Sequence, residues 1–363
     1  MISRVVLAVL LFTGALGAAA APPEQRVAVL RRGVNITNWF RYPPSRDPAA
    51  LRHYLSDRAI SQLQAVGFSF VRLPVQPDLL AMPATLTILT GAIRRLERAG
   101  LAVVVELHPL DWHLETSTAD RDRLLAGWHV LAPALRPLDP DKTFPELLNE
   151  PVFAGDPSGW QALQHRTLAA VRAVLPLSTI VLTGANWGSI GGLLALNAEA
   201  DGNVIYSFHL YDPAELTALA AYRPGLDTGA LARLPFPADD AAACQAAAPT
   251  VDMATADLIQ FYCAMGWNPA RLQAQIGAAA EWGRANHAAL LAGEFGASRR
   301  LNSAARLTWL MAARQGFEQL GIGWALWGYD DTMGFGIRPT PQATSLDNAM
   351  FPALGLTGQV SAK

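Results

Sequence analysis

Two glutamates stand at the ends of short apolar segments, and together they could perform acid-base and nucleophilic chemistry. Glu150 lies in the segment 147–151, which reads LLNEP, and Glu294 lies in 292–296, which reads AGEFG. An apolar segment before each glutamate indicates a packed strand that holds the carboxylate in a fixed position. Hydrolysis of a glycosidic bond with retention needs one carboxylate as proton donor and one as nucleophile. A structural ion pair is the alternative interpretation of either glutamate taken singly.

Several other polar or aromatic residues end apolar segments in the same way. They are Arg72, His108, Asn149, His209, Tyr211 and Trp327. An arginine within about 4 to 6 Å of a carboxylate lowers the pKa of that carboxylate. The two histidines could instead be buried side chains with satisfied hydrogen bonds, and Trp327 could fill the core. Aromatic residues that could either stack on sugar rings or simply pack also follow such segments: Trp39, Trp112, Trp187 and Tyr329.

Eight short apolar or β-branched segments must position these side chains. They cover residues 33–37, 68–74, 101–108, 143–149, 179–183, 204–209, 289–294 and 323–327. Apolar residues spaced three and four apart, which is typical of helices, occur between most of them, at 55–66, 86–99, 121–135, 160–175, 272–285 and 304–319. The alternation predicts a single (β/α)8 TIM barrel, in which the carboxyl ends of the strands face the active site.

The stretch 212–269 is too long and too rich in proline for an ordinary connection between a strand and a helix. Its apolar content is mostly alanine, so we expect a long loop after strand six rather than a second domain. Cys244 and Cys263 lie in this stretch, 19 positions apart. A disulfide and two buried free thiols are both open at this point, because a sequence does not give the separation of the two Cα atoms.

Taken in chain order, the strand-end residues resemble the functional set of glycoside hydrolase family 5, the cellulase-type retaining enzymes. The resemblance covers nearly the whole chain, from Arg32 to Ile337. It implies that Glu150 is the acid/base and Glu294 the nucleophile. It also implies that Asn149 donates to the sugar 2-hydroxyl, while Arg72 holds Glu294 ionised.

The resemblance further implies that His209 and Tyr211 adjust the two carboxylates and that Trp327 floors the subsite of the sugar being cleaved. The expected activity is retaining hydrolysis of a polysaccharide or oligosaccharide, as an endo-β-1,4-glucanase that uses no cofactor and no metal. A β-mannanase or a β-1,3-glucanase of the same family is the alternative.

Two other classes of protein are disfavoured by the residues themselves. A metal-dependent barrel hydrolase would carry a His-x-His pair after its first strand, where residues 35–37 read NIT. A sugar-binding barrel without activity would lack one of the two glutamates, and both are present.

Composition limits the partners and suggests a location. With 51% hydrophobic and 16% charged residues and a net charge of -2, the chain predicts a folded protein without a nucleic-acid partner. Residues 1–21 have a charged start, an apolar run of about a dozen residues and a small-residue end, which is typical of a secretory signal peptide. We therefore expect a catalytic domain at 22–363, secreted or periplasmic, monomeric and not membrane-bound after cleavage; an uncleaved anchor is the alternative.

Overall fold

The computed structural model describes residues 21–331, 334–340, 343 and 345–357 of the 363. The signal peptide expected at residues 1–21 therefore lies outside the described residues, except for Ala21. Within the described part of the chain, no helix has both the length and the apolar content that crossing a bilayer requires.

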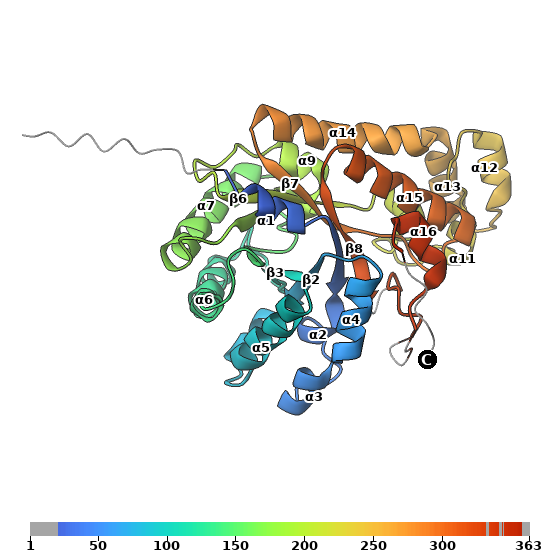
Figure 1. The fold of residues 1–363 in the computed structure, drawn as a ribbon. Coiled ribbons are helices and arrows are strands. Elements are labelled where there is room, and N and C mark those ends of the chain that lie inside the picture. Colours follow the sequence, from blue (N-terminus) through green and yellow to red (C-terminus); the bar gives the residue numbers. More distant parts are fainter. Residues whose placement is uncertain (1–20, 332–333, 341–342, 344, 358–363) are drawn as a thin grey trace, which may run out of the picture.

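Eight parallel strands close into a barrel in chain order (Figure 1), as the sequence predicts. They are β1 (Arg32–Ile36), β2 (Phe70–Val75), β3 (Ala102–Leu107), β4 (Thr143–Glu146), β5 (Ile180–Thr183), β6 (Val204–Leu210), β7 (Ala289–Phe295) and β8 (Gly323–Asp330). Strand β4 ends three residues before the expected end at Asn149, so Asn149 and Glu150 lie on the loop beyond it.

Long helices pack around the outside of the barrel. They are α4 (Asp57–Ala65), α5 (Thr85–Arg98), α6 (Thr118–Leu135), α7 (Pro157–Val174), α14 (Pro269–Ala285) and α15 (Ser303–Gln319). These six match the predicted helical segments. Side-chain caps fix several starts: Ser117 accepts from the Asp120 amide and begins α6 earlier than periodicity alone indicates.

The remaining helices occupy the connections. They are α1 (Glu24–Val29), α2 (Thr37–Phe40), α3 (Pro48–His53), α8 (Ala185–Gly188), α9 (Ile190–Leu194), α10 (Ala214–Thr217), α11 (Thr228–Leu231), α12 (Ala241–Ala247), α13 (Met253–Met265), α16 (Phe351–Leu354) and the 3-10 turns η1 (Pro77–Ala81) and η2 (Asn348–Met350).

The connection between β6 and α14 carries α10 to α13, and α11, α12 and α13 lie on the right-hand side of Figure 1. A disulfide joins Cys244 of α12 to Cys263 of α13, with the Cα atoms 5.6 Å apart, which decides between the two alternatives left open by the sequence. Apolar side chains of this connection, such as Leu216 and Leu231, are fully buried in the same core as the barrel helices.

The interior of the barrel changes from apolar to charged along its axis. Side chains such as Phe70, Val104 and Phe144 fill the layer near the amino ends of the strands. Successive side chains of a strand alternate between the two faces, so Arg72 lies two positions beyond Phe70 on the same interior face. Glu106 and Glu146 lie opposite each other across β3 and β4. A buried polar layer therefore underlies the carboxyl ends of the strands, where the candidate residues were expected.

Candidate active site

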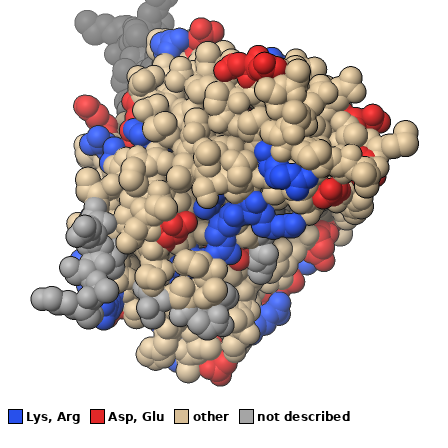
Figure 2. All heavy atoms as spheres, turned by 90° about the vertical axis from the view of Figure 1, so that its right-hand side faces the viewer, with Lys and Arg blue, Asp and Glu red and all other residues tan. Residues whose placement is uncertain are grey.

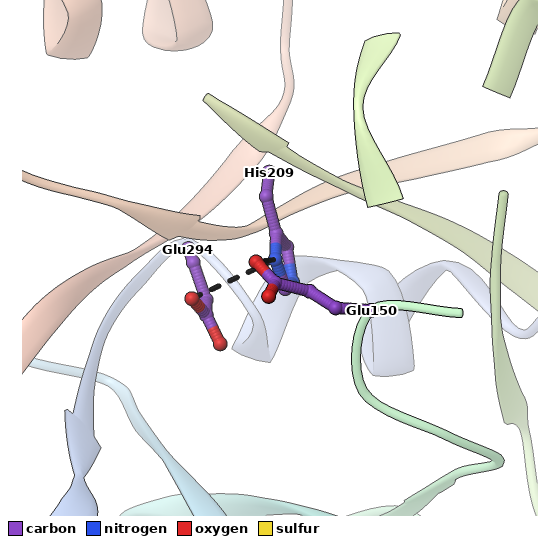
Figure 3. A group of neighbouring side chains, drawn as sticks. All are labelled: Glu150, His209 and Glu294. Carbon is purple, nitrogen blue, oxygen red and sulfur yellow. Dashed lines mark hydrogen bonds and ion pairs between the residues drawn. The ribbon is translucent and has the colours of Figure 1, made fainter. Parts of the chain in front are cut away.

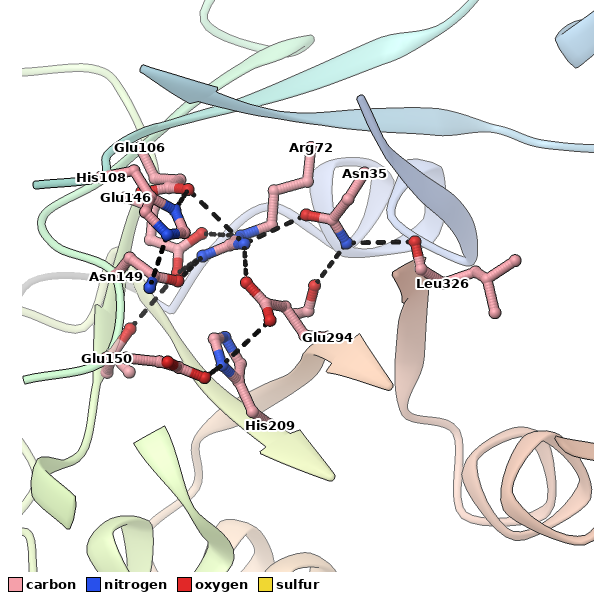
Figure 4. Close-up of polar contacts among 12 residues, drawn as sticks. Asn35, Arg72, Glu106, His108, Glu146, Asn149, Glu150, His209, Glu294 and Leu326 are labelled. Carbon is pink, nitrogen blue, oxygen red and sulfur yellow. Dashed lines mark hydrogen bonds and ion pairs between the residues drawn. The ribbon is translucent and has the colours of Figure 1, made fainter. Parts of the chain in front are cut away.

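Arg72 is the centre of the buried polar layer (Figure 4), and its side chain is fully buried. Its Nε and Nη2 atoms donate to the two oxygens of Glu146, at 2.7 and 2.9 Å. Its Nη1 atom donates to Glu294 at 2.6 Å and to Asn35 at 3.0 Å, and Nη2 also donates to Asn149 at 3.1 Å. These bonds satisfy all five N–H donors of the guanidinium and fix its plane.

Glu294 is held in place by the backbone of β7 as well as by Arg72. The pairing of β6 with β7 shifts register so that His209 faces Glu294, and Gly293 is the extra residue. A Cβ atom on Gly293 would lie 2.4 Å from Oγ of Ser207, so a side chain at this position would collide with Ser207 unless that hydroxyl moved. Asn35 donates to the Gly293 carbonyl at 3.1 Å and ties β1 to this point.

The carboxylate of Glu294 is ionised over a wide pH range. Burial alone raises its pKa, but the charges of His209 and Arg72 and a hydrogen bond from Tyr211 outweigh burial and lower the pKa to about 2. Tyr211 donates its hydroxyl to Oε2 at 2.8 Å, and Arg72 occupies Oε1. Each oxygen of this carboxylate therefore has a donor before any substrate arrives.

Glu150 faces Glu294 from the loop after β4 (Figure 3). One oxygen of Glu150, one oxygen of Glu294 and a ring nitrogen of His209 all lie within 4.8 Å of one another. Nδ1 of His209 is 2.9 Å from Glu150 and 3.6 Å from Glu294. Burial lowers the pKa of His209, but the two carboxylates outweigh burial and raise it. Glu150 has a φ of 40°, an unusual conformation of a kind that gathers at functional sites.

His108 and Asn149 form a second line of contacts that begins at a buried glutamate. Oε1 of Glu106 is 2.6 Å from Nδ1 of His108, and Nε2 of His108 is 3.1 Å from the amide nitrogen of Asn149. Arg72 donates to Oδ1 of Asn149, so the amide nitrogen of Asn149 donates to Nε2 of His108. The proton of the neutral ring then lies on Nδ1, which donates to Glu106. Since Oδ1 of Asn149 accepts from Arg72, the flip of its amide is fixed and its second N–H is left for a ligand.

A sequence model of the family described as Cellulase (glycosyl hydrolase family 5) matches residues 31–332. The chain belongs to glycosyl hydrolase family 5. Endoglucanase 3 of Fibrobacter succinogenes is 26% identical over 336 residues, covering 84% of this chain and 50% of that protein. Endoglucanase H of Acetivibrio thermocellus is 26% identical over 208 residues, covering 54% of this chain and 22% of that protein. The chain thus spans half or less of the length of these relatives.

Solved structures share the fold of this family 5 chain. The endoglucanase Cel5A of Thermotoga maritima superposes with a TM-score of 0.75 at 24% identity, over 92% of this chain and 100% of that one. The cellulose synthase subunit Z of Clostridioides difficile superposes with a TM-score of 0.70 at 20% identity, over 89% and 99%. At these identities the likeness concerns the barrel itself.

The aromatic candidates of the family 5 chain separate into cleft and core residues. A cavity of about 240 Å³ beside Glu150 is lined by Trp112 and Trp187, and the Trp187 side chain is 52% exposed. Of the two interpretations left open for Trp39, the structure supports packing in the core. Trp39 is fully buried and donates its Nε1–H to the carbonyl of Leu51, because α2 turns the indole into the core.

Trp327 borders the site but is only 3% exposed. Its ring is stacked near His108, with the ring centroids 6.1 Å apart, and the guanidinium of Arg41 lies over it at 5.1 Å. The indole of Trp327 therefore has no exposed face on which a sugar ring could stack in this arrangement. Tyr329, at 5% exposure, is also buried.

Four residues of the site were not among the sequence candidates: Asn35, Arg41, Glu106 and Glu146. Glu106 lies in β3 and Glu146 ends β4. A charged residue in an otherwise apolar run is the one signal that could have found them. Burial raises the pKa of Glu106 to about 7, although Arg72 opposes this shift, and burial also raises the pKa of Glu146.

The group of Glu150, His209 and Glu294 has the residue types of a metal site. Most of the donor atoms are nonetheless already used: Nδ1 of His209 is directed to Glu150, and the Glu294 oxygens accept from Arg72 and Tyr211. Nε2 of His209 is buried and has no partner among the described residues. A divalent cation there would also be held close to the fixed charge of Arg72. The arrangement fits acid-base and nucleophilic chemistry better than metal binding.

Proposed function

We propose that this family 5 chain hydrolyses internal β-1,4 bonds of a glucan with retention of configuration, with Glu294 as nucleophile and Glu150 as acid/base. The observation that carries the proposal is the distance between the two carboxylates. Retaining enzymes hold them about 5 to 5.5 Å apart, whereas inverting enzymes leave about 6.5 to 9.5 Å for a water molecule. An oxygen of Glu150 within 4.8 Å of an oxygen of Glu294 supports retention.

In the first step, an oxygen of Glu294 attacks the anomeric carbon while Glu150 gives its proton to the departing glycosidic oxygen. The carbon–oxygen bond to the leaving sugar breaks, and an ester bond to Glu294 forms. The hydrogen bonds from Arg72 and Tyr211 orient the nucleophile and keep it ionised. His209, beside both carboxylates, can stabilise the charge that Glu150 acquires when it loses its proton.

In the second step, ionised Glu150 takes a proton from water, and the resulting hydroxide attacks the anomeric carbon and releases Glu294. Two inversions at one carbon give overall retention. The second N–H of Asn149 is placed to donate to the sugar 2-hydroxyl, a bond that strengthens in the transition state of such reactions.

The names of the relatives, which are endoglucanases, support the choice of a β-1,4-glucan. The test is the anomeric configuration of the first product from cellohexaose, followed by proton magnetic resonance, together with a panel of carboxymethylcellulose, glucomannan, mixed-linkage glucan and laminarin. We expect the β-anomer first and the highest kcat/KM on β-1,4-glucan, with Glu294→Gln inactive on all four. The α-anomer first would contradict retention. Preference for glucomannan or laminarin would identify a mannanase or a β-1,3-glucanase instead.

We also propose that the protein needs no metal and is exported as a monomer. For the metal, dialysis against a chelator should leave kcat/KM unchanged. The disulfide between Cys244 and Cys263 supports export, because disulfides persist in oxidising compartments. Determination of the mature amino terminus tests cleavage after residue 21, and ultracentrifugation tests the monomer.

A further inference from the structure

Arg41 follows α2 at the carboxyl end of the barrel and lines the same cavity as Glu150 and Asn149. The mechanism described above gives this residue no task. Its guanidinium carbon lies 4.5 Å from the ring centroid of Tyr42 and 5.1 Å from that of Trp327. Contacts of this kind with aromatic faces hold a guanidinium in place and leave its N–H donors in the plane of the group.

The N–H donors of Arg41 have no partner among the residues that the structure describes. Its Nε atom is buried and makes no hydrogen bond there, and no ion pair involves its charge. A buried donor without a partner is costly, and more so when the group is charged. Such a donor indicates that another group, from solvent or from a ligand, completes the site.

Other arginines near the cleft have their charge compensated. Arg72 pairs with Glu146 and Glu294, and Arg123, which lies over Trp112, pairs with Asp78 and Asp120. The acidic residues that line the cavity do not supply a partner for Arg41. Glu150 is bonded to His209, and Glu115 lies 3.9 Å from His113.

A second group of arginines lies at the carboxyl end of the barrel. Arg299, which follows β7, donates to the carbonyl of Arg338, which follows β8, at 2.5 Å. Arg300 donates to Thr228 of α11 at 2.7 Å. Figure 2 shows basic side chains gathered in the middle of the face that the right-hand side of Figure 1 presents. Positive charge on that face can attract polyanions over longer distances.

We propose that Arg41 binds a carboxylate carried by the glucan, so that the preferred substrate is an acidic, carboxyl-bearing β-glucan. This inference rests on the function proposed above and names the substrate class of the same site. The N–H donors in the plane of a stacked guanidinium match the spacing of the two oxygens of a carboxylate. The neutral hydroxyl groups of glucose do not offer such a matched, charged pair of acceptors. Arg41 is a specificity-determining residue under this proposal, and it takes no part in bond breaking.

The test compares cellohexaose with cellohexaose whose C6 hydroxymethyl groups are partly oxidised to carboxylates. Binding is measured by calorimetry on the Glu294→Gln protein, and kcat/KM is measured on the active protein. We expect the carboxylated ligand to bind at least tenfold more tightly than the neutral one in 50 mM salt, and this preference to shrink in 500 mM salt. Arg41→Gln should abolish the preference, measured as the ratio of the two affinities and as the ratio of the two kcat/KM values. Arg41→Lys keeps the positive charge but loses the paired N–H donors of the guanidinium, so it should retain part of the preference for the carboxylated ligand.

Arg123→Gln is the matched control, because it removes an arginine that also stacks on a tryptophan but whose charge is already paired; the preference should persist in it. Equal binding of both ligands by the Glu294→Gln protein would overturn the proposal, as would an equal loss on both substrates in Arg41→Gln, which would assign Arg41 to ordinary sugar hydroxyls. Failure of the active protein to cleave neutral cellohexaose would instead count against the proposed function, and the binding measurement would still decide the role of Arg41.

Discussion

Nη1 of Arg72 lies 2.6 Å from Oε1 of Glu294, and both side chains are almost completely buried. A buried ion pair adds little net stability, because removing two charges from water offsets their attraction. In this barrel the pair instead keeps a carboxylate ionised inside the protein, and the bidentate bond of Arg72 to Glu146 fixes the direction from which the charge acts. The polar layer thus holds Glu294 ionised and oriented, as its proposed role as nucleophile requires.

Tyr211→Phe removes the hydroxyl that donates to Glu294 but keeps the ring that packs against Phe335. A donor stabilises the ionised carboxylate, so its loss raises the pKa of Glu294. Hydrogen bonds to charged groups contribute about 1.5 to 3 kcal/mol, which corresponds to roughly one pH unit or more. We expect the acid limb of kcat/KM against pH to move upward by about one unit. Tyr222→Phe, which removes a hydroxyl of an exposed tyrosine bonded to Glu215, is the control. An unmoved acid limb in Tyr211→Phe would contradict the assignment.

Glu106→Gln tests the raised pKa of a buried glutamate. Between pH 4.3, the ordinary value, and about 7, the unfolded chain has lost the Glu106 proton while the folded chain keeps it. The free energy of unfolding of the wild type therefore falls as pH rises through this window. The variant cannot ionise, so its stability relative to the wild type should rise by about 2 kcal/mol between pH 5 and 7.

The measurement is urea unfolding at several pH values. Glu281→Gln, at an exposed glutamate, should follow the wild type throughout. A constant difference between Glu106→Gln and wild type at every pH would show that Glu106 is already ionised in the folded protein.

Trp187→Ala and Trp39→Ala should have opposite effects, because one indole lines the cleft and the other fills the core. Loss of the half-exposed Trp187 should raise KM for cellohexaose about three- to tenfold, with unfolding free energy within about 0.5 kcal/mol of wild type. Loss of the buried Trp39 should cost about 3 to 5 kcal/mol of stability and leave KM unchanged in the folded fraction. Titrations with cellohexaose and denaturant distinguish the two, and an unchanged KM in Trp187→Ala would remove it from the binding cleft.

The double substitution Cys244→Ala, Cys263→Ala opens a loop closed over 19 positions. Chain entropy in the unfolded state predicts a loss of about 3 kcal/mol. Because the bridge joins α12 to α13 and makes no contact with the catalytic pair, kcat/KM at a temperature where the variant stays folded should be unchanged. A loss of activity in the folded variant would mean that the β6–β7 connection shapes the site.

Much of this architecture can be predicted because parallel strands that are buried on both faces give continuous apolar runs in the sequence. Each strand reads as an apolar run, and the polar residue that ends it marks the catalytic end of the barrel. Glu294 and His209, each next to the last residue of its strand, follow this pattern, whereas Arg72 lies inside β2. The pattern gives strand positions better than strand ends, so β4 stops at Glu146 while Glu150 lies on the following loop.

The features that could not be predicted depend on the direction in which a side chain points and on the residues that it contacts. Trp39 follows β1 just as the cleft tryptophans follow their strands, and only the turn into α2 decides that its indole points to the core. Glu106 and Glu146 each lie in a predicted strand. The register of strand pairing that brings them to Arg72 cannot be predicted from either segment alone. Arg41 was missed because a sequence does not show that a side chain is buried without a hydrogen-bond partner.

The assignment of Glu294 as nucleophile is tested most directly by trapping the covalent intermediate. A 2-deoxy-2-fluoro-β-cellobioside with a dinitrophenyl leaving group slows both steps but lets the first proceed, so the glycosyl enzyme accumulates. We predict that peptide mapping by mass spectrometry finds one fluorocellobiosyl group per chain, attached to Glu294, and that Glu294→Gln remains unlabelled. Attachment to Glu150, or no attachment together with an α-configured first product from cellohexaose, would contradict the mechanism.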